Sequence, residues 1–463
     1  MKILLINPSQ KNVYGSPIKP AYPPLGLLYI ASVLEKEGHI LEIVDFDNDD
    51  MNGSKFIHLL SRFKPDVVGL TATTSTIDNT KKLAELAKKI LKVPIIIGGI
   101  HATIAPEDVL KCNAVDFIVL GEGEITISEL LKEMKKNKPN FSKIKGIGYK
   151  NNSKTIITPP RPLIENLDSL PFPARHLLKN EYTPPDALKT PVASIFTSRG
   201  CPGRCTYCCT KLIFGYRFRF RSIKNVADEI ELLLSKGVKE IHIMDDNFTV
   251  YKEWVLKFRD EILKRNIKTT FVFANGLRAD KIDEEILRAL KQIGVLSVGF
   301  GVESGNQNIL NIIKKDIELD TVRKAYKLSK KLGFETWGFF IIGLPEETKE
   351  TVRDTIEFAK ELDPDFAKFL ILKPFPGSEV FNQLNNKNLI FDYNYSHYGV
   401  YTAPVHNLEN LTAEDMVKMQ KKAFKEFYLR PKKILQHLLR MRSVTQLKLN
   451  FKSAIFILQK IAG

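Results

Sequence analysis

The stretch "VASIFTSRGCPGRCTYC", residues 192–208, joins a short apolar run to a loop that is rich in cysteine. The apolar run contains β-branched residues and is too short for a helix, which predicts a buried β-strand. Because the loop follows this strand directly, its thiols are expected at the carboxyl end of the strand. The loop region holds four of the five cysteines of the chain: Cys201, Cys205, Cys208 and Cys209.

The residues that follow continue to alternate apolar runs with amphipathic stretches as far as about residue 375. The apolar runs are "VASIFTS", "EIHIMD", "TTFVFAN", "VLSVGFGVES", "FETWGFFIIG" and "FAKFLIL". Six strand–helix units make three-quarters of a (β/α) barrel, so we expect a partial (β/α)6 barrel over residues 191–400. Barrel enzymes gather their chemistry at the carboxyl ends of the strands, where the cysteine loop lies.

A second alternation covers residues 1–140 and predicts an α/β domain, doubly wound around a five-stranded parallel sheet. Ligands of such sheets bind outside the carboxyl ends of the strands. The sequences at those ends are "NPS", "TATTST", "GGIHAT" and "GEGE". Residues 141–190 are rich in proline and are interpreted as a linker, and residues 401–463 as a basic helical C-terminal region.

Length and composition narrow the class of protein. A chain of 463 residues suggests two or three domains. No stretch approaches the ~18 consecutive apolar residues of a membrane span, and the first apolar run is too short for a secretory signal. We therefore expect a cytoplasmic protein, in which clustered thiols bind metal or perform redox chemistry. The net charge of +16 is compatible with an anionic partner or with a lysine-rich surface.

The spacing C-x-x-x-C-x-x-C lets three thiolates converge on one cluster and leaves one metal without a protein ligand. This pattern favours a [4Fe-4S] cluster over zinc, because structural zinc takes four ligands from the protein. Cys209 adjoins Cys208, and neighbouring side chains rarely point at one ion. Cys209 is interpreted as a small core thiol, with a role facing the cluster or the substrate as the alternative.

The motif "CPGRCTYC" resembles that of the radical S-adenosylmethionine (SAM) superfamily, including the aromatic Tyr207 before the third cysteine. The resemblance implies that Cys201, Cys205 and Cys208 hold a [4Fe-4S] cluster whose remaining iron binds the amino and carboxylate groups of SAM. One electron then cleaves SAM to a 5′-deoxyadenosyl radical. Tyr207 is expected beside the adenine, or else only packs the loop.

Residues at the later strand ends are candidates for SAM binding. The stretch "MDDNF", residues 244–248, lacks the glycines of the family's commoner version, which leaves open which polar residue receives the amino group of SAM. "NGLRAD" offers polar groups, "GVESG" a carboxylate for the ribose hydroxyls, and "GFFIIGLPEE" glycines that admit adenine. Helix capping or surface ion pairing is the alternative for each. The candidates are Tyr207, Asp245, Asp246, Asn247, Asn275, Arg278, Glu303 and Gly343.

The first domain resembles the cobalamin-binding domain that precedes the barrel in one radical SAM subfamily, through "PPLGLLYIASVLEKEGH", "GGIHAT" and "GEGE". Many cobalamin domains bind cobalt with a histidine after the first strand. "NPSQKNVYG" has none, so the lower ligand is expected to be absent or water. His101 is expected to hydrogen-bond rather than bind cobalt, and the glycines could merely build turns. The candidates are Asn7, Ser9, Thr71, Thr73, Thr74, Ser75, Gly98, Gly99, His101, Gly121 and Glu122.

The resemblance implies an enzyme that uses a [4Fe-4S] cluster, SAM and cobalamin to methylate an unactivated carbon. The same cofactors could serve a rearrangement, cyclisation or oxidation, and the sequence does not separate these reactions. An RNA methylthiotransferase should carry a second cysteine triad in its first domain, which contains only Cys112. A non-enzymatic metal-binding protein would not cleave SAM.

Four kinds of partner are considered. A small-molecule or lipid substrate and an external one-electron donor such as flavodoxin or ferredoxin are expected, and nucleic acid is not. The basic tail could lie on the inner face of a membrane, but packing across the open side of the barrel is favoured. The apolar side chains of the tail are Phe424, Phe427, Ile434, Leu435, Leu438 and Leu439.

Overall fold

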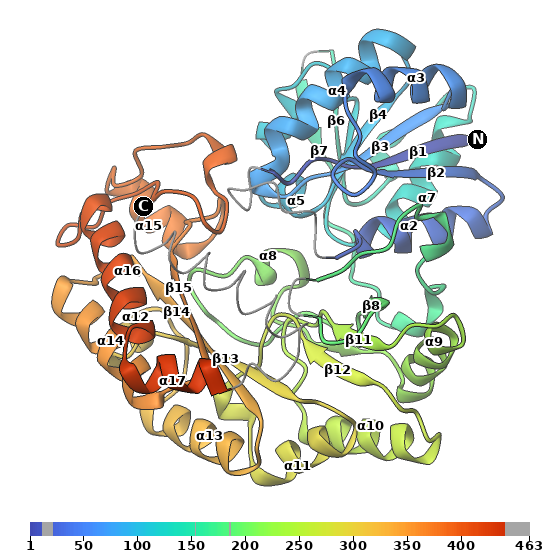
Figure 1. Cartoon of the computed structure of the whole chain (residues 1–463). Helices are drawn as coiled ribbons and strands as arrows, with labels where there is room; N and C mark the ends of the chain where they lie inside the picture. Colours follow the sequence, from blue (N-terminus) through green and yellow to red (C-terminus); the bar gives the residue numbers. More distant parts are fainter. Residues whose placement is uncertain (12–21, 153, 185–186, 440–463) are drawn as a thin grey trace.

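The computed structural model describes residues 1–11, 22–152, 154–184 and 187–439. An N-terminal α/β domain lies against one end of a second, barrel-like domain, and short segments fill the region between them (Figure 1). No helix within these ranges is long and apolar enough to cross a membrane.

The N-terminal domain is built on one seven-stranded sheet of order β2-β1-β3-β4-β5-β6-β7. Strands β1 to β5 are parallel, as expected for a doubly wound domain. Strands β6 and β7 are antiparallel additions. The strands are β1 (Lys2–Asn7), β2 (Ile40–Asp45), β3 (Val67–Thr71), β4 (Ile95–Gly98), β5 (Phe117–Val119), β6 (Ile147–Asn151) and β7 (Lys154–Ile157).

The last two strands differ from the interpretation of residues 141–190 as a linker. The first proline of this region is Pro159, and the preceding proline-free stretch is able to form a hairpin that continues the sheet. Beyond β7 the chain runs without long elements over the surface of the domain. There Tyr182 donates to the Asp45 carboxylate at 2.9 Å, which ties this later stretch to the end of β2.

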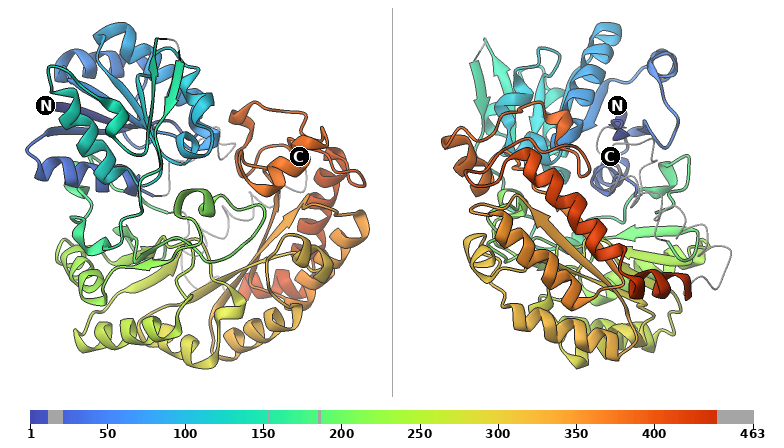
Figure 2. Two further views of the ribbon diagram at one scale, coloured as in Figure 1. Left: turned by 180° about the vertical axis from the view of Figure 1, so that it is seen from behind. Right: turned by 60° about the vertical axis from the view of Figure 1, so that its left-hand side comes forward.

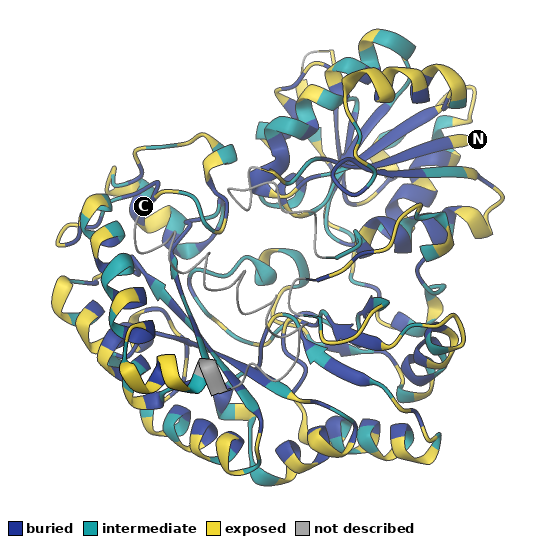
Figure 3. Cartoon of the chain, viewed as in Figure 1, coloured by how far each residue is buried: buried dark blue, intermediate teal, exposed yellow. Residues whose placement is uncertain are grey.

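Helices cover both faces of the N-terminal sheet, so that its strands are buried on two sides (Figure 3). One face packs against α3, α4 and α6, and the other against α2 and α7. The helices are α2 (Leu25–Lys36), α3 (Gly53–Phe63), α4 (Ile77–Leu91), α5 (Ile100–Ile104), α6 (Pro106–Leu110) and α7 (Gly123–Met134); a 3-10 turn, η1 (Thr74–Thr76), precedes α4.

The second domain contains the six parallel strands that the sequence predicts. Two three-stranded sheets, β8-β11-β12 and β13-β14-β15, are joined by parallel bridges from Phe271 to Val295 and from Leu277 to Phe300. The strands therefore follow one another in chain order and form a partial (β/α)6 barrel (Figure 2). They are β8 (Val192–Ile195), β11 (Glu240–Ile243), β12 (Thr270–Phe273), β13 (Ser297–Glu303), β14 (Glu335–Ile342) and β15 (Phe366–Ile371).

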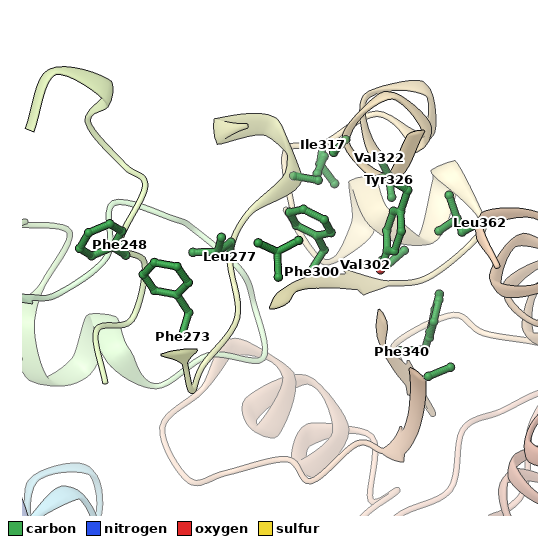
Figure 4. Packing of buried hydrophobic residues seen from close by; sticks show 14 of the residues in the cluster. Phe248, Phe273, Leu277, Phe300, Val302, Ile317, Val322, Tyr326, Phe340 and Leu362 are labelled. Atoms are coloured by element: carbon green, nitrogen blue, oxygen red, sulfur yellow. The ribbon is translucent and has the colours of Figure 1, made fainter. Parts of the chain in front are cut away.

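The barrel helices pack on the outer face of these strands. Phe300, Tyr326 and Phe340 belong to the apolar cluster between strands and helices (Figure 4). Alternate residues of β14 and β15 are fully buried on this side, which is the period of two expected for a strand. The helices are α9 (Ile223–Ser235), α10 (Lys252–Lys264), α11 (Glu284–Gln292), α12 (Gln307–Ile312), α13 (Leu319–Lys331), α14 (Lys349–Leu362) and α15 (Glu379–Asn386).

The C-terminal helix α16 (Ala413–Tyr428) closes the free edge of β15 (Figure 2). The hydroxyl group of Tyr428 bonds both the amide and the carbonyl of Ala367, and the Gln420 amide donates to the Phe369 carbonyl at 2.7 Å. Phe424 and Phe427 are buried against Phe369. Packing on the barrel was the favoured expectation for the C-terminal tail, and α16 packs in this way.

The chain continues from α16 into α17 (Pro431–Leu439), where Ile434 and Leu435 are exposed. Lys433 is buried and pairs with Asp363 at 2.8 Å. The proposed membrane-facing stripe includes Leu438 and Leu439, whose side chains lie outside the described residues, as do residues 440–463. The structure therefore places only part of the predicted stripe.

Candidate active site

The cysteine loop leaves the barrel through a short antiparallel ribbon. Strand β9 (Ser198–Arg199) leads into the loop and β10 (Arg219–Phe220) leads out of it, with Arg199 opposite Arg219. Gly200 has φ +91°, and a Cβ atom there would lie 2.1 Å from the carbonyl oxygen of Arg217. Only glycine allows the two arms of the ribbon to approach so closely.

The three thiols of the motif form a donor set suited to a cluster. Burial raises the pKa of the Cys201 and Cys208 thiols, and each is raised further by neighbouring thiol groups. The amide of Gly203 points at Cys201 Sγ at 3.4 Å, and the amide of Thr210 at Cys208 Sγ at 3.5 Å. Three thiolates side by side repel one another, and a bound metal centre removes that penalty.

The set does not resemble a mononuclear site. Across the described ranges, no three His, Cys, Asp or Glu side chains stand close enough to share one metal ion. A [4Fe-4S] cluster fits the loop better, because each thiolate then binds a different iron atom.

The fourth cysteine of the loop faces another way. The Sγ atom of Cys209 lies 4.0 Å from the carbonyl oxygen of Pro376, in the segment that follows β15. Burial raises the pKa of this thiol to about 12. The contact with the segment after β15 favours the interpretation of Cys209 as a core residue.

A buried ion pair lies beside the loop at the carboxyl end of β13. Lys315 Nζ is 2.6 Å from Glu303 Oε1 and 3.5 Å from the Tyr207 hydroxyl oxygen. Glu303 adopts φ +65° at an irregularity of β13, and a Cβ atom on Gly301 would lie 2.5 Å from its carboxylate. Left-handed backbone at a residue other than glycine is a strained conformation that clusters at functional sites.

Arg278 extends from the end of β12 to the same place. Its guanidinium pairs with Asp280 at 2.8 Å and donates to the Lys315 carbonyl at 2.7 Å. It also lies against Gly203, where a Cβ atom would be 3.5 Å from Nη1 of the arginine. A cation is thus fixed beside Cys201 and beside the Lys315–Glu303 pair.

The end of β11 carries two carboxylates in different surroundings. Asp245 is buried and accepts from the amide of Thr197 at 2.7 Å, from the Thr197 hydroxyl and from the Ser198 hydroxyl at 2.6 Å. Burial raises its pKa to about 6. Asp246 is exposed and lies near the thiols, where its charge contributes to the raised pKa of Cys201 and Cys208.

In the N-terminal domain, the strand ends β3 and β4 form a tight polar edge. Thr73 and Thr76 cap η1 reciprocally. Gly99 has φ +96°, and a Cβ atom there would lie 2.7 Å from the Ala72 carbonyl oxygen. His101 is fully buried, with Nδ1 3.2 Å from the Thr74 hydroxyl and Nε2 3.1 Å from Asp108.

The N-terminal domain and the barrel meet at the cysteine loop. Helix α8 (Thr210–Phe214), which follows Cys209, packs against α5 of the N-terminal domain. At the same place a Cβ atom on Gly377 would lie 3.0 Å from a methyl group of Leu212 and 3.6 Å from the Ile104 carbonyl oxygen. The strand ends of one domain therefore adjoin the thiol loop of the other (Figure 1).

Comparison with known families agrees with both halves of this arrangement. Residues 11–131 match the B12 binding domain, and residues 195–359 match the radical SAM superfamily. An uncharacterized methyltransferase of Pyrococcus horikoshii is 37% identical over 439 residues, covering 94% of this chain and 94% of the relative. The chain belongs to the cobalamin-binding radical SAM enzymes.

Two further relatives have more specific names. Cytidylyl-2-hydroxyethylphosphonate methyltransferase of Streptomyces wedmorensis is 30% identical, and the match covers 82% of this chain and 81% of the relative. Anaerobic magnesium-protoporphyrin IX monomethyl ester cyclase of Rubrivivax gelatinosus is also 30% identical, and the match covers 85% of this chain and 72% of the relative. Among solved structures, the methyltransferase TsrM from Kitasatospora setae shares the fold, with a TM-score of 0.71, 19% identity and coverage of 83% and 78%.

The cofactors of this radical SAM enzyme are therefore a [4Fe-4S] cluster, SAM and cobalamin. The residues that hold them stay predictions, but the geometry separates the candidates. Tyr207, Asp246, Arg278 and Glu303 all lie at the cysteine loop or beside it. Asn247 is buried, and its amide nitrogen has no hydrogen-bond partner among the described residues, which fits a donor directed at a ligand.

Two SAM candidates at the ends of β11 and β12 have structural duties instead. The carboxylate of Asp245 is occupied by the end of β8, as described above, so an ammonium group would have to displace those donors. The Asn275 amide donates to the main-chain carbonyls of Met244 and Asp245 at 2.9 and 3.2 Å and thereby links the ends of β11 and β12. We therefore expect Asp246 to accept from the amino group of SAM, whereas the unpartnered amide nitrogen of Asn247 is a donor and needs an acceptor group of a ligand.

Gly343 lies against the C-terminal region of the chain. This residue has φ +90°, and a Cβ atom would lie 2.8 Å from the sulfur of Met416 and 3.3 Å from His406 Nε2. The need for glycine here has a structural explanation within the protein, and the assignment of Gly343 to SAM stays a prediction. Its left-handed backbone and this close packing explain the residue.

Glu122 is engaged by donors of the protein. Its carboxylate accepts from Arg199 and Arg219 of the barrel, both at 2.8 Å, and from the Ile164 amide at 2.8 Å. These donors leave little capacity for a cofactor amide. Sequence reasoning placed Glu122 at a strand end correctly, but its partners are remote in the sequence.

Other cobalamin candidates differ in how much of their polar capacity is already used. Asn7 and Ser9 donate to Asp45 at 2.7 Å and Asp47 at 2.6 Å, which fixes the start of the loop after β1. Gly121 has φ +67° with open space where a Cβ atom would stand, and Gly98 has only ordinary contacts. The residues still suited to the cofactor by position are Thr71, Thr73, Ser75, Gly98, Gly99 and Gly121.

Lys315 is the site residue that sequence reasoning missed. It follows α12 in a lysine-rich stretch, "NIIKKDI", and nothing in its spacing distinguishes it from surface lysines. Its burial and its pairing with Glu303 appear only when α12 folds back on β13. A buried lysine must be paired, so its position points to a role in the site.

A further buried carboxylate, that of Glu347, supports the turn after β14 and makes the stability of the protein depend on pH. Glu347 accepts from the amides of Gly343 at 2.7 Å and Leu344 at 3.1 Å, and burial raises its pKa from 4.5 to about 8. Between these two values the folded chain holds a proton that the unfolded chain releases, so stability falls as pH rises from about 4.5 to 8.

Glu347→Gln should remove this component, which amounts to a few kcal/mol across the window at about 1.4 kcal/mol per pKa unit. The measurement is the thermal midpoint at pH 5 and at pH 8 under anaerobic conditions. The control is Glu350→Gln, which changes an exposed glutamate on the same turn of chain. An identical loss of stability between the two pH values in wild type and Glu347→Gln would contradict the assignment.

Proposed function

We propose that the enzyme is a C-methyltransferase, with cobalamin as the methyl carrier and SAM as the source of both the methyl group and the 5′-deoxyadenosyl radical. When bound, the three cofactors supply the one-electron cleavage and the methyl transfer to an unactivated carbon. The observation that carries the proposal is the contact of α5 with α8, which brings the strand ends of the B12 binding domain to the thiol loop. A methyl carrier and a radical source need this proximity to act on one carbon.

The residues of the chain would position these groups and keep water out. Three thiolates hold the cluster at three corners, and Asp246 receives the amino group of SAM. Glu303, oriented by Lys315, accepts from the ribose hydroxyls, and Tyr207 lies against the adenine. The names of two relatives, both methyltransferases, support methylation. The cyclase relative supports the alternative of a ring-forming reaction with the same cofactors.

A small-molecule substrate and an electron donor are general needs of radical SAM enzymes. We expect the donor to be a flavodoxin or ferredoxin and the substrate to be a small molecule or a lipid. Location in the cytoplasm, with contact of the tail to the inner membrane face, stays a prediction. The exposed side chains of Ile434 and Leu435 on α17 are compatible with such a contact.

The test is anaerobic reconstitution with iron, sulfide and hydroxocobalamin, followed by dithionite and SAM that carries a trideuterated methyl group. Crude metabolite and lipid extracts serve as the source of substrate. The proposal expects 5′-deoxyadenosine together with a product that has gained the labelled methyl group. A product with unchanged carbon count would replace methylation by cyclisation or rearrangement. Absence of 5′-deoxyadenosine in wild type would overturn radical chemistry altogether.

A further inference from the structure

Two paired arginines hold the base of the cysteine loop. Arg199 and Arg219 stand opposite each other in the β9–β10 ribbon, one just before the loop and one just after it. Both guanidinium groups bind the same carboxylate of the other domain, because Glu122 Oε1 accepts from Arg199 and Glu122 Oε2 from Arg219, each at 2.8 Å. Glu124 adds a second carboxylate to Arg199 at 2.6 Å. We call these four residues the interdomain clasp.

The ion pairs of the interdomain clasp are buried, so loss of one partner is expected to cost much free energy. The exposed fraction of the side chain is 4% for Glu122, 5% for Arg219 and 12% for Arg199. Exposed ion pairs contribute little, but loss of one partner from a buried pair leaves an uncompensated charge away from water. The aromatic ring of Tyr29, 5.2 Å from the Arg199 guanidinium carbon, encloses the pair further.

The main chain next to the ribbon is fixed by the same group. The Ile164 amide donates to Glu122 Oε2 at 2.8 Å, and the Ile164 carbonyl accepts from Arg219 Nη1 at 2.6 Å. Three segments that are remote in sequence therefore meet at one carboxylate: the start of α7, the stretch after β7 and the β9–β10 ribbon. Arg199, Arg219 and the Ile164 amide use most of the acceptor capacity of Glu122.

The middle of the loop is held differently. The Thr206 amide donates to the Ile313 carbonyl at 3.0 Å, and the Thr206 carbonyl accepts from Val380 at 3.2 Å. These are main-chain bonds to segments of the barrel. The loop is thus attached to both domains: its centre bonds to the barrel, and its two ends bind Glu122 of the N-terminal domain in addition to their links to the ends of β8 and β11.

We propose that Glu122 is a positioning residue, which fixes the thiol loop to the B12 binding domain through Arg199 and Arg219. The cluster and the cobalamin are then held at a fixed separation, because the N-terminal domain positions both the thiol loop and the cobalamin. Glu122 touches neither cofactor and acts through the arginines. The inference rests on the proposed function only in requiring that both cofactors work together.

The first test uses the protein without cofactors. Hydrogen exchange of the amides of residues 200–218 is compared in wild type, Glu122→Gln and Glu129→Gln. Glu129 is the matched control, because it also pairs with an arginine, Arg161 at 3.1 Å, on the same helix, but does not reach the barrel. We expect exchange in this segment to rise about tenfold or more in Glu122→Gln only, since local opening becomes easier.

The second test uses the reconstituted enzyme. Pulsed electron paramagnetic resonance measures the separation between cob(II)alamin and the reduced cluster. We expect one narrow distance in wild type and in Glu129→Gln, and a broad distribution in Glu122→Gln. A merely stabilising residue would lower cofactor content without altering the distance. Glu122→Asp, which keeps the charge, should restore part of the narrow component.

Three outcomes decide the matter. Unchanged exchange of residues 200–218 together with an unchanged distance in Glu122→Gln overturns the inference. If Glu122→Gln does not take up its cofactors, the exchange measurement on the empty protein still decides. A further outcome is that the wild-type enzyme shows one narrow distance, which Glu122→Gln broadens, while the wild type transfers no methyl group to any product. In that case the inference stands and the proposed methylation fails.

Discussion

Alanine at any one of Cys201, Cys205 or Cys208 abolishes the brown iron–sulfur absorbance and the formation of 5′-deoxyadenosine. The reason is that a cluster held at three corners loses one third of its protein ligands, with no other thiolate placed to replace it. Removing a metal ligand removes binding free energy that the rest of the site does not supply. The measurements are the absorption spectrum and product analysis after anaerobic reconstitution.

Cys209→Ala is the matched control within the same loop. Its thiol faces the Pro376 carbonyl, so this variant should keep both the absorbance and the activity. Retained absorbance in any of the three ligand variants, or its loss in Cys209→Ala, would show that the assignment of the triad is wrong.

The second large effect concerns the Glu303–Lys315 pair. Glu303→Gln or Lys315→Met leaves one buried charge without its partner, which costs about 3–5 kcal/mol in comparable pairs. We expect each single variant to keep its cluster, to bind SAM much more weakly and to form little 5′-deoxyadenosine. The KM for SAM and the rate of 5′-deoxyadenosine formation are the quantities to measure.

The double variant separates binding from folding. Glu303→Gln with Lys315→Met removes both charges, so its stability should be higher than the sum of the two single losses predicts. SAM cleavage should nevertheless stay low, because the acceptor for the ribose is still missing. Normal SAM cleavage in the stable double variant would exclude both residues from the SAM site.

Much of the fold could be predicted because it rests on local patterns. Strands β8 and β11 to β15 are visible as short apolar runs, and the thiol triad lies within eight residues of chain. The hairpin of β6 and β7 was missed because nearby prolines outweighed a short proline-free stretch. Neither strand alternates buried and exposed residues, so the period of two that marks many antiparallel strands is missing here.

The site was predicted less well where partners are distant in sequence. Glu122 lies at a strand end, where a ligand contact is a reasonable expectation, but its arginines follow 77 and 97 residues later. Gly343 was assigned to adenine because a glycine at a strand end suggests close approach of a ligand, and nothing in the sequence indicated that Met416 packs against the same glycine. Non-local pairing of this kind depends on the packing of whole domains.

The way α16 covers β15 has a consequence for where this protein can be divided. Tyr428 and Gln420 satisfy main-chain groups that would otherwise stay bare on the last strand. A fragment that stops at residue 400 would expose this row of donors and acceptors, which is a template for pairing between molecules. The radical-generating half of the chain is thus a folding unit only when its C-terminal helix is kept with it.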